Sequence, residues 1–262
     1  MWGVFMFGVL KIEERKTGLI NRIKYIFNKP QPLLEKVTVK NGAPFFAVTI
    51  FENTDGTIDY NEIYRILGRC AKRLVISRDT DFTETRDVGL FRPSLLPYLL
   101  LFNSGVKLSK KYTEEQQTNK LTLGIIDLDG ILKERIIPLV QIFANIKIIT
   151  DNPLNFEPVC DKILSEWGLP IIITDNENGV ADCDFILSPF IIPNSVFSNC
   201  CAIRNSENGA LTRFSGEGVT LPPEYSQLIP ENTDPLIFAS ALFELCGVNS
   251  LSDMSFDKMK KI

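Results

Sequence analysis

The 262-residue chain contains no histidine. Histidine is the commonest general base in enzymes, the usual partner of serine and cysteine nucleophiles, and a frequent zinc ligand. Its absence therefore excludes serine–histidine and cysteine–histidine catalytic pairs, together with most kinds of zinc site. Any chemistry in this chain has to use carboxylates, lysine, tyrosine, cysteine or a bound metal.

The six cysteines form no C-x-x-C pair, and the neighbours Cys200 and Cys201 are poorly placed to bridge each other. We expect the cysteines to be small core side chains in a reducing cytoplasm, because they are scattered among apolar residues. Cys183 lies between Asp182 and Asp184. Their negative charge should raise the pKa of its thiol, so we do not expect a thiolate nucleophile there.

Neither sign of charge dominates, with 28 Lys and Arg against 32 Asp and Glu. The chain offers no broad basic field for a phosphate backbone, so no nucleic-acid partner is expected. The apolar opening run, MWGVFMFGVL, lacks a basic leader and is too short to span a bilayer. We therefore expect a buried first strand, a cytoplasmic protein and no membrane partner.

Four short apolar runs follow one another in the second half of the chain, and each ends beside an acidic or hydroxyl residue. Two of the intervals between them hold enough sequence for a helix, which predicts β-α-β units and a buried parallel sheet. The runs are Leu121–Ile126, Ile146–Ile149, Ile171–Ile173 and Phe185–Leu187.

The turn after the first run, Asp127-Leu128-Asp129-Gly130, occupies the place of a nucleotide-binding loop. The order of strand, turn, helix and second strand, with Asp151 about 21 residues after Gly130, resembles NAD(P)-binding Rossmann domains, most of all those of shikimate-dehydrogenase-type two-domain proteins. The G-x-G-x-x-G fingerprint is missing, and Asp127, Asp129 and Leu132 stand in its place. Two carboxylates within about 5 Å of a pyrophosphate would cost on the order of several kcal/mol. The resemblance thus implies a degenerate Rossmann-like domain in which NAD(P) is disfavoured.

The same segment, IIDLDGIL, is also similar to the first motif of haloacid-dehalogenase-type phosphatases. In that family one aspartate attacks phosphorus and the next but one acts as acid and base beside Mg²⁺. The resemblance implies these roles for Asp127 and Asp129, with Thr150 at the end of the second strand. Asp182 or Asp184 would complete the magnesium site.

A structural interpretation of this segment stays open as well. Asp-Gly between alternating residues favours a hairpin, here with apolar Leu132 and Ile136 alternating with charged neighbours. Pro138 would then start a short helix. In this interpretation Asp127 and Asp129 are turn residues with no catalytic role.

If the chain binds a small molecule, we expect the site at the carboxyl ends of the predicted strands, between the two domains. Open α/β sheets form their ligand crevice along that edge. Besides Asp127 and Asp129, the candidate residues are Gly130, Thr150, Asp151, Thr174, Asp175 and Ser188.

A second α/β region precedes the central stretch. It holds predicted strands at Val37–Val39, Phe45–Phe51 and Leu74–Ile76, and a helix opened by a capping box of Asp59 and Glu62. A basic amphipathic helix is also predicted within Leu19–Phe27.

The predicted fold class is α/β, with two α/β domains of which the C-terminal one is a Rossmann-like parallel sheet. The polar stretch Ser109–Lys120 is the predicted linker. It separates an N-terminal α/β domain in 1–112 from a Rossmann-like domain in 113–230. In 231–262 we predict a helix that packs on the sheet domains, capped by Thr233 or Asp234 and ended by Gly247.

The sequence names no reaction. The favoured hypothesis is a degenerate Rossmann-like protein without redox chemistry, acting as a binding or regulatory module. One alternative is a Mg²⁺-dependent phosphatase that uses Asp127 and Asp129, with Asp184 as a further metal ligand. The other is a structural or oligomerising protein with Pro193–Phe197 or the apolar amino terminus as its contact surface.

Overall fold

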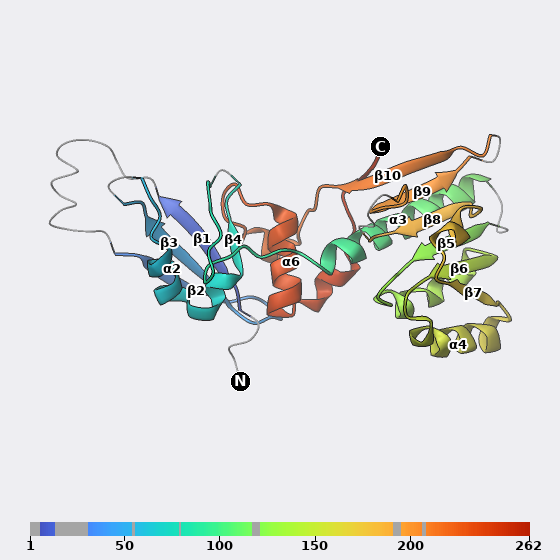
Figure 1. Cartoon of the computed structure of the whole chain (residues 1–262), viewed down its shortest axis with the longest axis horizontal. Coiled ribbons are helices and arrows are strands. Elements are labelled where there is room, and N and C mark those ends of the chain that lie inside the picture. The colour runs from blue at the N-terminus through green and yellow to red at the C-terminus, as the bar shows by residue number, and fades with distance from the viewer. Residues whose placement is uncertain are drawn as a thin grey trace. The chain divides into compact units, whose positions relative to one another are not determined.

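The computed structural model describes residues 6–13, 31–53, 56–78, 80–116, 121–190, 195–205 and 208–262. The chain forms two compact units. Unit 1 comprises Met1–Leu96 and Thr220–Ser252, and unit 2 comprises Pro97–Val219 and Asp253–Ile262 (Figure 1). Each unit has its own sheet with helices beside it, so the predicted α/β class with two units is confirmed.

Unit 1 is built on a four-stranded sheet in the order β2-β3-β1-β4. Three neighbouring strands run parallel, and β2 pairs antiparallel with β3 at the edge. The predicted strands β3 and β4 are confirmed, whereas the strand expected at Val37–Val39 lies earlier in the chain. The predicted helix within Leu19–Phe27 falls outside the described residues. The strands are β1 (Gly8–Glu13), β2 (Leu33–Val37), β3 (Phe45–Phe51) and β4 (Leu74–Ile76).

Helix α2 (Tyr60–Leu67) covers one face of this sheet and continues into a 3-10 helix, η1 (Gly68–Lys72). Its buried residues Ile63 and Leu67 join a core that includes β-strand side chains such as Leu10. The predicted N-cap is confirmed, because the Asp59 carboxylate accepts a hydrogen bond of 3.1 Å from the N–H of Glu62.

Helix α6 (Pro235–Cys246) packs on the unit 1 sheet (Figure 1). The ring of Phe238 meets those of Phe7 and Phe45 edge-on, at centroid distances of 6.2 and 5.7 Å. Both predicted ends are confirmed: the Asp234 carboxylate accepts from the N–H of Leu236 at 2.8 Å, and Gly247 stops the helix with φ +73°. Short helices flank α6, namely α5 (Pro223–Ser226) and the 3-10 helix η6 (Asn249–Asp253).

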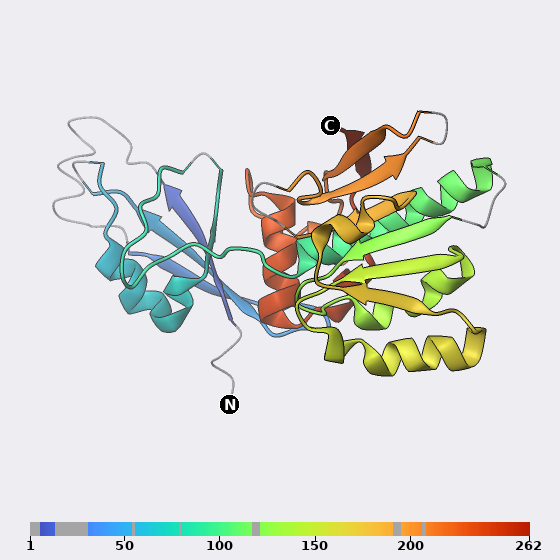
Figure 2. The same cartoon turned by 45° about the vertical axis from the view of Figure 1, so that its right-hand side comes forward.

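Unit 2 is built on a seven-stranded sheet in the order β11-β10-β9-β8-β5-β6-β7 (Figure 2). Its parallel part is β8-β5-β6-β7. If these four strands are numbered 1 to 4 along the chain, their order across the sheet is 4-1-2-3, which is the order in one half of a Rossmann sheet. The other three strands are antiparallel, so the sheet is mixed rather than wholly parallel. The strands are β5 (Thr122–Ile126), β6 (Asn145–Ile149), β7 (Ile171–Thr174), β8 (Phe185–Ser188), β9 (Cys200–Arg204), β10 (Leu211–Glu217) and β11 (Lys258–Lys261).

The connection from β5 to β6 contains no α-helix. It consists of two 3-10 helices, η2 (Lys133–Arg135) and η3 (Ile137–Gln141), and Pro138 lies in the first turn of η3. The helix that the Rossmann resemblance implies here is therefore missing, and the alternating hairpin is wrong as well. Leu132 and Ile136 are both fully buried and four residues apart, which is the spacing of a helical turn rather than of a strand face.

The remaining connections follow the β-α-β prediction only once. Between β6 and β7 lie η4 (Pro153–Asn155) and helix α4 (Glu157–Trp167), whereas only η5 (Glu177–Val180) joins β7 to β8. Among the described residues, no helix combines the length and the apolar character that crossing a membrane requires.

The stretch Ser109–Lys120 is not a linker over its described part, because helix α3 (Leu96–Gln116) runs through it. Two of its side chains are docked: Ser109 is fully buried, and the Tyr112 hydroxyl donates to the carbonyl of Arg204 at 3.2 Å. The units instead divide the chain at 96/97, 219/220 and 252/253. Residues 231–262 are likewise shared, since α6 packs on the unit 1 sheet and β11 pairs with β10 in unit 2.

Glu244 on α6 holds the segment that leads into α3. One of its oxygens accepts from the backbone N–H of Leu95 and Leu96 at 2.9 and 3.1 Å, and the other accepts from the Ser94 hydroxyl at 2.8 Å. These N–H groups belong to a helix start, where no intrahelical acceptor exists. The carboxylate supplies that acceptor from a position about 150 residues along the chain.

We predict that Glu244→Gln lowers the free energy of unfolding by roughly 1–3 kcal/mol, because an amide has one acceptor oxygen where the carboxylate has two. Urea denaturation followed by circular dichroism measures the change. Glu35→Gln, at an exposed carboxylate on β2, is the matched control and should shift stability by no more than about 0.5 kcal/mol. Equal stability of the two variants would contradict the capping role.

Candidate functional site

The predicted crevice residues all follow strands of the parallel part of the unit 2 sheet. Asp127, Asp129 and Gly130 come after β5, Thr150 and Asp151 after β6, and Asp175 after β7, while Thr174 and Ser188 end β7 and β8. Because the four strands are parallel, these positions share one edge of the sheet. In an α/β sheet this is the edge at which a ligand site is expected.

The Asp127 side chain is fully buried, and both of its carboxylate oxygens are occupied. One accepts from the N–H of Ile131 at 2.9 Å and the other from the N–H of Leu132 at 2.7 Å. The turn that leads from Asp127 to these two amides depends on Gly130, whose φ of +74° is costly for other residues. Burial raises the pKa of the Asp127 carboxyl, and the hydrogen bonds from the Leu132, Ile131 and Gly130 amides oppose that rise.

The loop after β6 is bonded directly to the loop after β5. The carbonyl oxygen of Leu128 accepts from the Thr150 hydroxyl at 3.2 Å, from the Asp151 N–H at 3.3 Å and from the Asn152 side-chain amide at 3.1 Å. The Thr150 hydroxyl also accepts from the N–H of Asn152 at 3.1 Å. The polar groups that could line a crevice here are therefore used to hold two loops of the chain together.

The other predicted residues along this edge behave differently. The Thr174 hydroxyl accepts from the N–H of Asn176 at 3.1 Å, as in a turn, and Asp129, Asp151 and Asp175 are exposed. Ser188 is fully buried at the end of β8, and its Oγ has no hydrogen-bond partner within the described residues. The edge thus brings together the loops after β5 and β6 but leaves the exposed acids without a shared ligand position.

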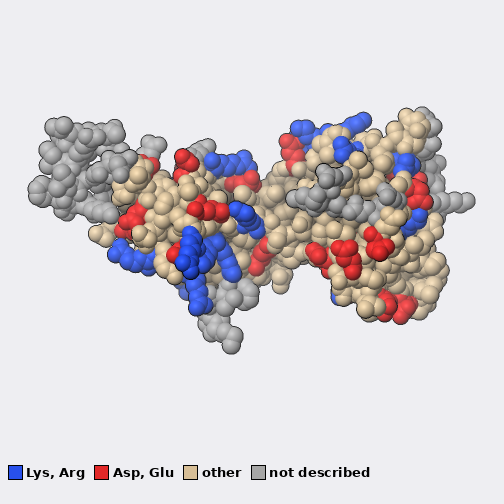
Figure 3. All heavy atoms as spheres, in the orientation of Figure 1, with Lys and Arg blue, Asp and Glu red and all other residues tan. Residues whose placement is uncertain are grey.

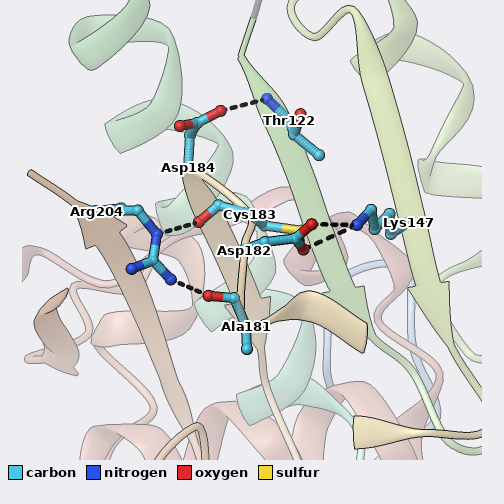
Figure 4. A network of polar contacts seen from close by, with 7 residues as sticks. All are labelled: Thr122, Lys147, Ala181, Asp182, Cys183, Asp184 and Arg204. Atoms are coloured by element: carbon cyan, nitrogen blue, oxygen red, sulfur yellow. Dashed lines mark hydrogen bonds and ion pairs between the residues drawn. The ribbon is translucent and has the colours of Figure 1, made fainter. Parts of the chain in front are cut away.

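Asp182 and Asp184 lie at the opposite edge of the sheet (Figure 4). The Asp184 carboxylate accepts from the N–H of Thr122, the first residue of β5, at 2.8 Å. Asp127 follows the last residue of that strand, so about 16 Å of extended chain separates the two carboxylates. The predicted metal set of Asp127, Asp129 and Asp184 is consequently not assembled.

Three further observations bear on the phosphatase resemblance. Within the described ranges, no group of three or more carboxylate or cysteine side chains is arranged to hold a metal ion. Lys162, the residue to which the resemblance would assign the family's phosphate-binding lysine, is exposed on α4. In such a phosphatase one carboxylate oxygen of Asp127 would attack phosphorus. Here both oxygens accept hydrogen bonds from backbone amides.

A polar network at the amino edge centres on Arg204, which was not among the predicted site residues (Figure 4). Its guanidinium donates to the carbonyls of Cys183 at 3.2 Å, of Gly209 at 2.8 Å and of Ala181. Its backbone N–H donates to the Asp184 carbonyl at 2.8 Å. The contacts with Ala181, Cys183 and Asp184 tie β9 to the segment before β8, and the contact with Gly209 holds the turn between β9 and β10, so the network stabilises the sheet.

Lys147 on β6 extends this network. Its ammonium group lies 2.8 Å from each carboxylate oxygen of Asp182, and this hydrogen bond lowers the pKa of Asp182 and raises that of Lys147. The acids that flank Cys183 in the sequence therefore have structural partners. No local signal in the sequence predicted this, because Lys147 and Arg204 come from distant strands.

Burial makes the cysteines poor nucleophiles. The pKa of the Cys183 thiol is raised to about 12, first by burial and then by Asp182, so the expected effect of charge is present but secondary. Burial alone raises the pKa of Cys246 to about 12. The thiol pKa values of the other four cysteines are raised as well, and all six thiols are free.

No protein-family model and no curated protein sequence matches this chain. Among solved structures, it is similar to L-tryptophan dehydrogenase from Nostoc punctiforme, with 13% sequence identity and a TM-score of 0.27. The match covers 70% of this chain and 55% of the dehydrogenase chain. The fold and the site described above define the class, a two-unit α/β protein with a Rossmann-type strand order and a loop edge closed by its own hydrogen bonds.

We predict that Asp127→Asn lowers the free energy of unfolding by roughly 1–3 kcal/mol, because the amide offers one acceptor to two backbone donors. The folded-state pKa of Asp127 is raised above the ordinary 3.8. Its stabilising contribution is therefore complete below that value and declines as the pH rises through the folded pKa. The stability difference between wild type and variant should accordingly be largest near about pH 4 and shrink towards about pH 8.

Urea denaturation across this pH range tests the prediction. Asp129→Asn, two residues away and exposed, is the control and should change stability by no more than about 0.5 kcal/mol. A stability difference for Asp127→Asn that increases with pH would show that the charged form is the more stable one in the folded chain.

A second prediction concerns thiol reactivity. A thiol with a pKa of about 12 is ionised to roughly one part in 10⁴ at pH 8, against about a quarter for an ordinary thiol. We expect iodoacetamide to label the half-buried Cys70 and Cys160 first, and to leave Cys183 and Cys246 unlabelled until the chain is unfolded. Peptide mass spectrometry with and without guanidinium measures this order. Rapid native labelling of Cys183 would contradict it.

Proposed function

We propose that this chain is a binding or regulatory protein without redox chemistry, in which the Rossmann-like unit 2 serves as a scaffold and holds no dinucleotide. One observation carries the proposal: the Asp127 carboxylate accepts from the Ile131 and Leu132 amides in the loop after β5. In dinucleotide-binding folds, the amides of the corresponding loop and helix start bind the pyrophosphate.

The chain's own carboxylate thus takes the role that a phosphate oxygen would have. An incoming pyrophosphate would have to displace Asp127 from two charge-assisted hydrogen bonds and then lie beside a second carboxylate, Asp129. The loop is followed by 3-10 helices rather than by an α-helix. The positive helix end that favours a bound phosphate is consequently missing as well.

Dinucleotide-binding folds also need a carboxylate that binds the ribose hydroxyls, and Asp151 is the predicted candidate for this role. Asp151 is exposed, and its N–H donates to the Leu128 carbonyl. With the pyrophosphate position filled, a free carboxylate at the end of β6 does not complete a nucleotide site. What supports the scaffold proposal is this combination of a retained strand order and a filled loop.

The prediction is that NADH and NADPH show no saturable binding tighter than about 1 mM to the full chain. Isothermal titration calorimetry measures binding, and thermal unfolding of the same samples confirms that the chain is folded. A dinucleotide at about a hundred times its Kd would add roughly 2.7 kcal/mol to the stability of the folded chain. Micromolar binding of either cofactor would overturn the proposal.

The same preparations separate the phosphatase alternative. Mg²⁺-dependent hydrolysis of p-nitrophenyl phosphate that disappears in Asp127→Asn and persists in Asp129→Glu would establish Asp127 as a nucleophile. The scaffold proposal expects equal, background hydrolysis in all three chains, because both Asp127 oxygens are held by backbone amides.

A further inference from the structure

Two adjoining hollows lie in unit 1, at the carboxyl ends of its parallel strands. The first has a volume of about 540 Å³ and is lined by residues that follow β3 and residues around the start of α2. The second, of about 480 Å³, is lined by the end of β1, by Ser77 after β4 and by residues 230–233. Ile12 and Thr80 line both hollows. We call the pair the unit 1 cleft.

The size and place of the unit 1 cleft are those of a ligand site. Pockets for small molecules have volumes of roughly 300–1,000 Å³. Open α/β sheets bind ligands beyond the carboxyl ends of parallel strands, and β3, β1 and β4 are parallel neighbours. At the corresponding edge of unit 2, hydrogen bonds hold the loops after β5 and β6 together, whereas hollows lie at this edge of unit 1.

One wall of the cleft is fixed by contacts between distant parts of the chain. Ser77 and Thr233 form an antiparallel bridge, and the N–H of Arg78 donates to the carbonyl of Asn232 at 2.9 Å. The Arg78 guanidinium also pairs with Asp234 at 2.6 Å. This wall is therefore set before any ligand arrives, which reduces the conformational entropy lost on binding.

The charges that line the cleft favour a cation. Among the described residues, four charged side chains line it: Glu52, Asp81 and Glu231 are acidic, and Lys11 is basic. Lys11 already pairs with Glu13 at 3.1 Å, whereas the three acids make no ion pair within the described residues. On the face drawn in Figure 3, acidic and basic side chains are interspersed over the described surface. The acidic lining is thus a local feature.

The cleft also offers hydrogen-bonding groups and an aromatic ring. Tyr60 lines the first hollow, with its ring held edge-on against Phe82 at 5.5 Å, and a tyrosine face attracts cations. Thr233 lines the second hollow. It is 7% exposed, and its Oγ1 has no hydrogen-bond partner in the described part of the chain. A buried hydroxyl without a partner destabilises the free protein and is one of the marks of a site awaiting a ligand.

We propose that the unit 1 cleft binds a small organic amine of the diamine or polyamine class. One ammonium group lies between Glu52 and Asp81 in the first hollow, and a second lies at Glu231 in the other. The Thr233 hydroxyl accepts a hydrogen bond from the second ammonium group. The site belongs to unit 1 and is independent of the scaffold role proposed for unit 2.

The experiment is calorimetric titration of the full chain with spermidine. Succinate, 1,4-butanediol and MgCl₂ at matched ionic strength are compared with it. We expect saturable spermidine binding tighter than about 1 mM, and none with the other three. Glu231→Gln and Asp81→Asn should each weaken binding at least about tenfold, because each removes a charge-assisted hydrogen bond. Glu35→Gln, an exposed acid of unit 1 that lines neither hollow, should leave the affinity unchanged.

The variant Thr233→Val tests whether the Thr233 hydroxyl binds the ligand or is only an unpaired group that destabilises the free protein. Removing an unsatisfied hydroxyl should leave the melting temperature equal or higher, and at the same time weaken spermidine binding several-fold. Unchanged affinity in a folded Thr233→Val chain would overturn the assignment of this hydroxyl to the ligand.

Three results would overturn the cleft as an amine site. The first is no spermidine binding up to about 10 mM. The second is binding of equal strength in wild type, Glu231→Gln, Asp81→Asn and Glu35→Gln, which is general attraction to an acidic chain. The third is equal heat from succinate or 1,4-butanediol. Spermidine, succinate and 1,4-butanediol are all compared on the wild-type chain, so a variant that fails to fold does not prevent the test.

Discussion

The buried carboxylate of Asp127 is the interaction on which the loop edge of unit 2 depends. A charge removed from water is costly unless hydrogen bonds compensate it, and here two backbone amides from the following residues offset part of that cost, while burial still raises the pKa of the carboxyl. The same bonds set the course of the chain from β5 into the 3-10 helices. They also use the amides that a Rossmann loop presents to phosphate. A single side chain thereby holds the loop and occupies two of its backbone amides.

Hydrogen bonds within the chain hold both edges of the unit 2 sheet, and different groups make them at each edge. At the carboxyl edge the Leu128 carbonyl gathers donors from the loop after β6. At the amino edge the Arg204 guanidinium donates to two carbonyls before β8 and to one in the turn between β9 and β10. The strand order alone assigns no chemistry to this edge, because function is argued from the site and not from the fold.

Unit 1 presents the opposite situation at its corresponding edge. Its parallel strands end at two hollows whose acidic side chains lack ion-pair partners among the described residues. The wall beside them is nevertheless well fixed, through Arg78 and the residues before α6. The proposal of a small-molecule site therefore concerns unit 1, where the acids of the cleft make no ion pair and the Thr233 hydroxyl has no hydrogen-bond partner within the described residues.

Local features of this chain could be predicted from the sequence alone. Strands β3 and β4 and the apolar runs that became β5 to β8 follow from short-range patterns, as do the caps at Asp59, Asp234 and Gly247. Each depends on residues within one turn or one strand of each other. The missing glycine fingerprint, with Asp127 in its place, was likewise visible in the sequence.

Tertiary structure decided the rest, because the deciding contacts join residues far apart in the chain. The polar end of α3 could not be told from a linker, since Tyr112 finds its partner at Arg204. Asp127 and Asp184 looked like members of one site, but the length of β5 separates them across the sheet. Likewise, β11 is polar and pairs only through its backbone with β10, and Glu244 completes a helix start about 150 residues away. Periodicity reports which side chains are buried, whereas partners at long range depend on how the strands are ordered.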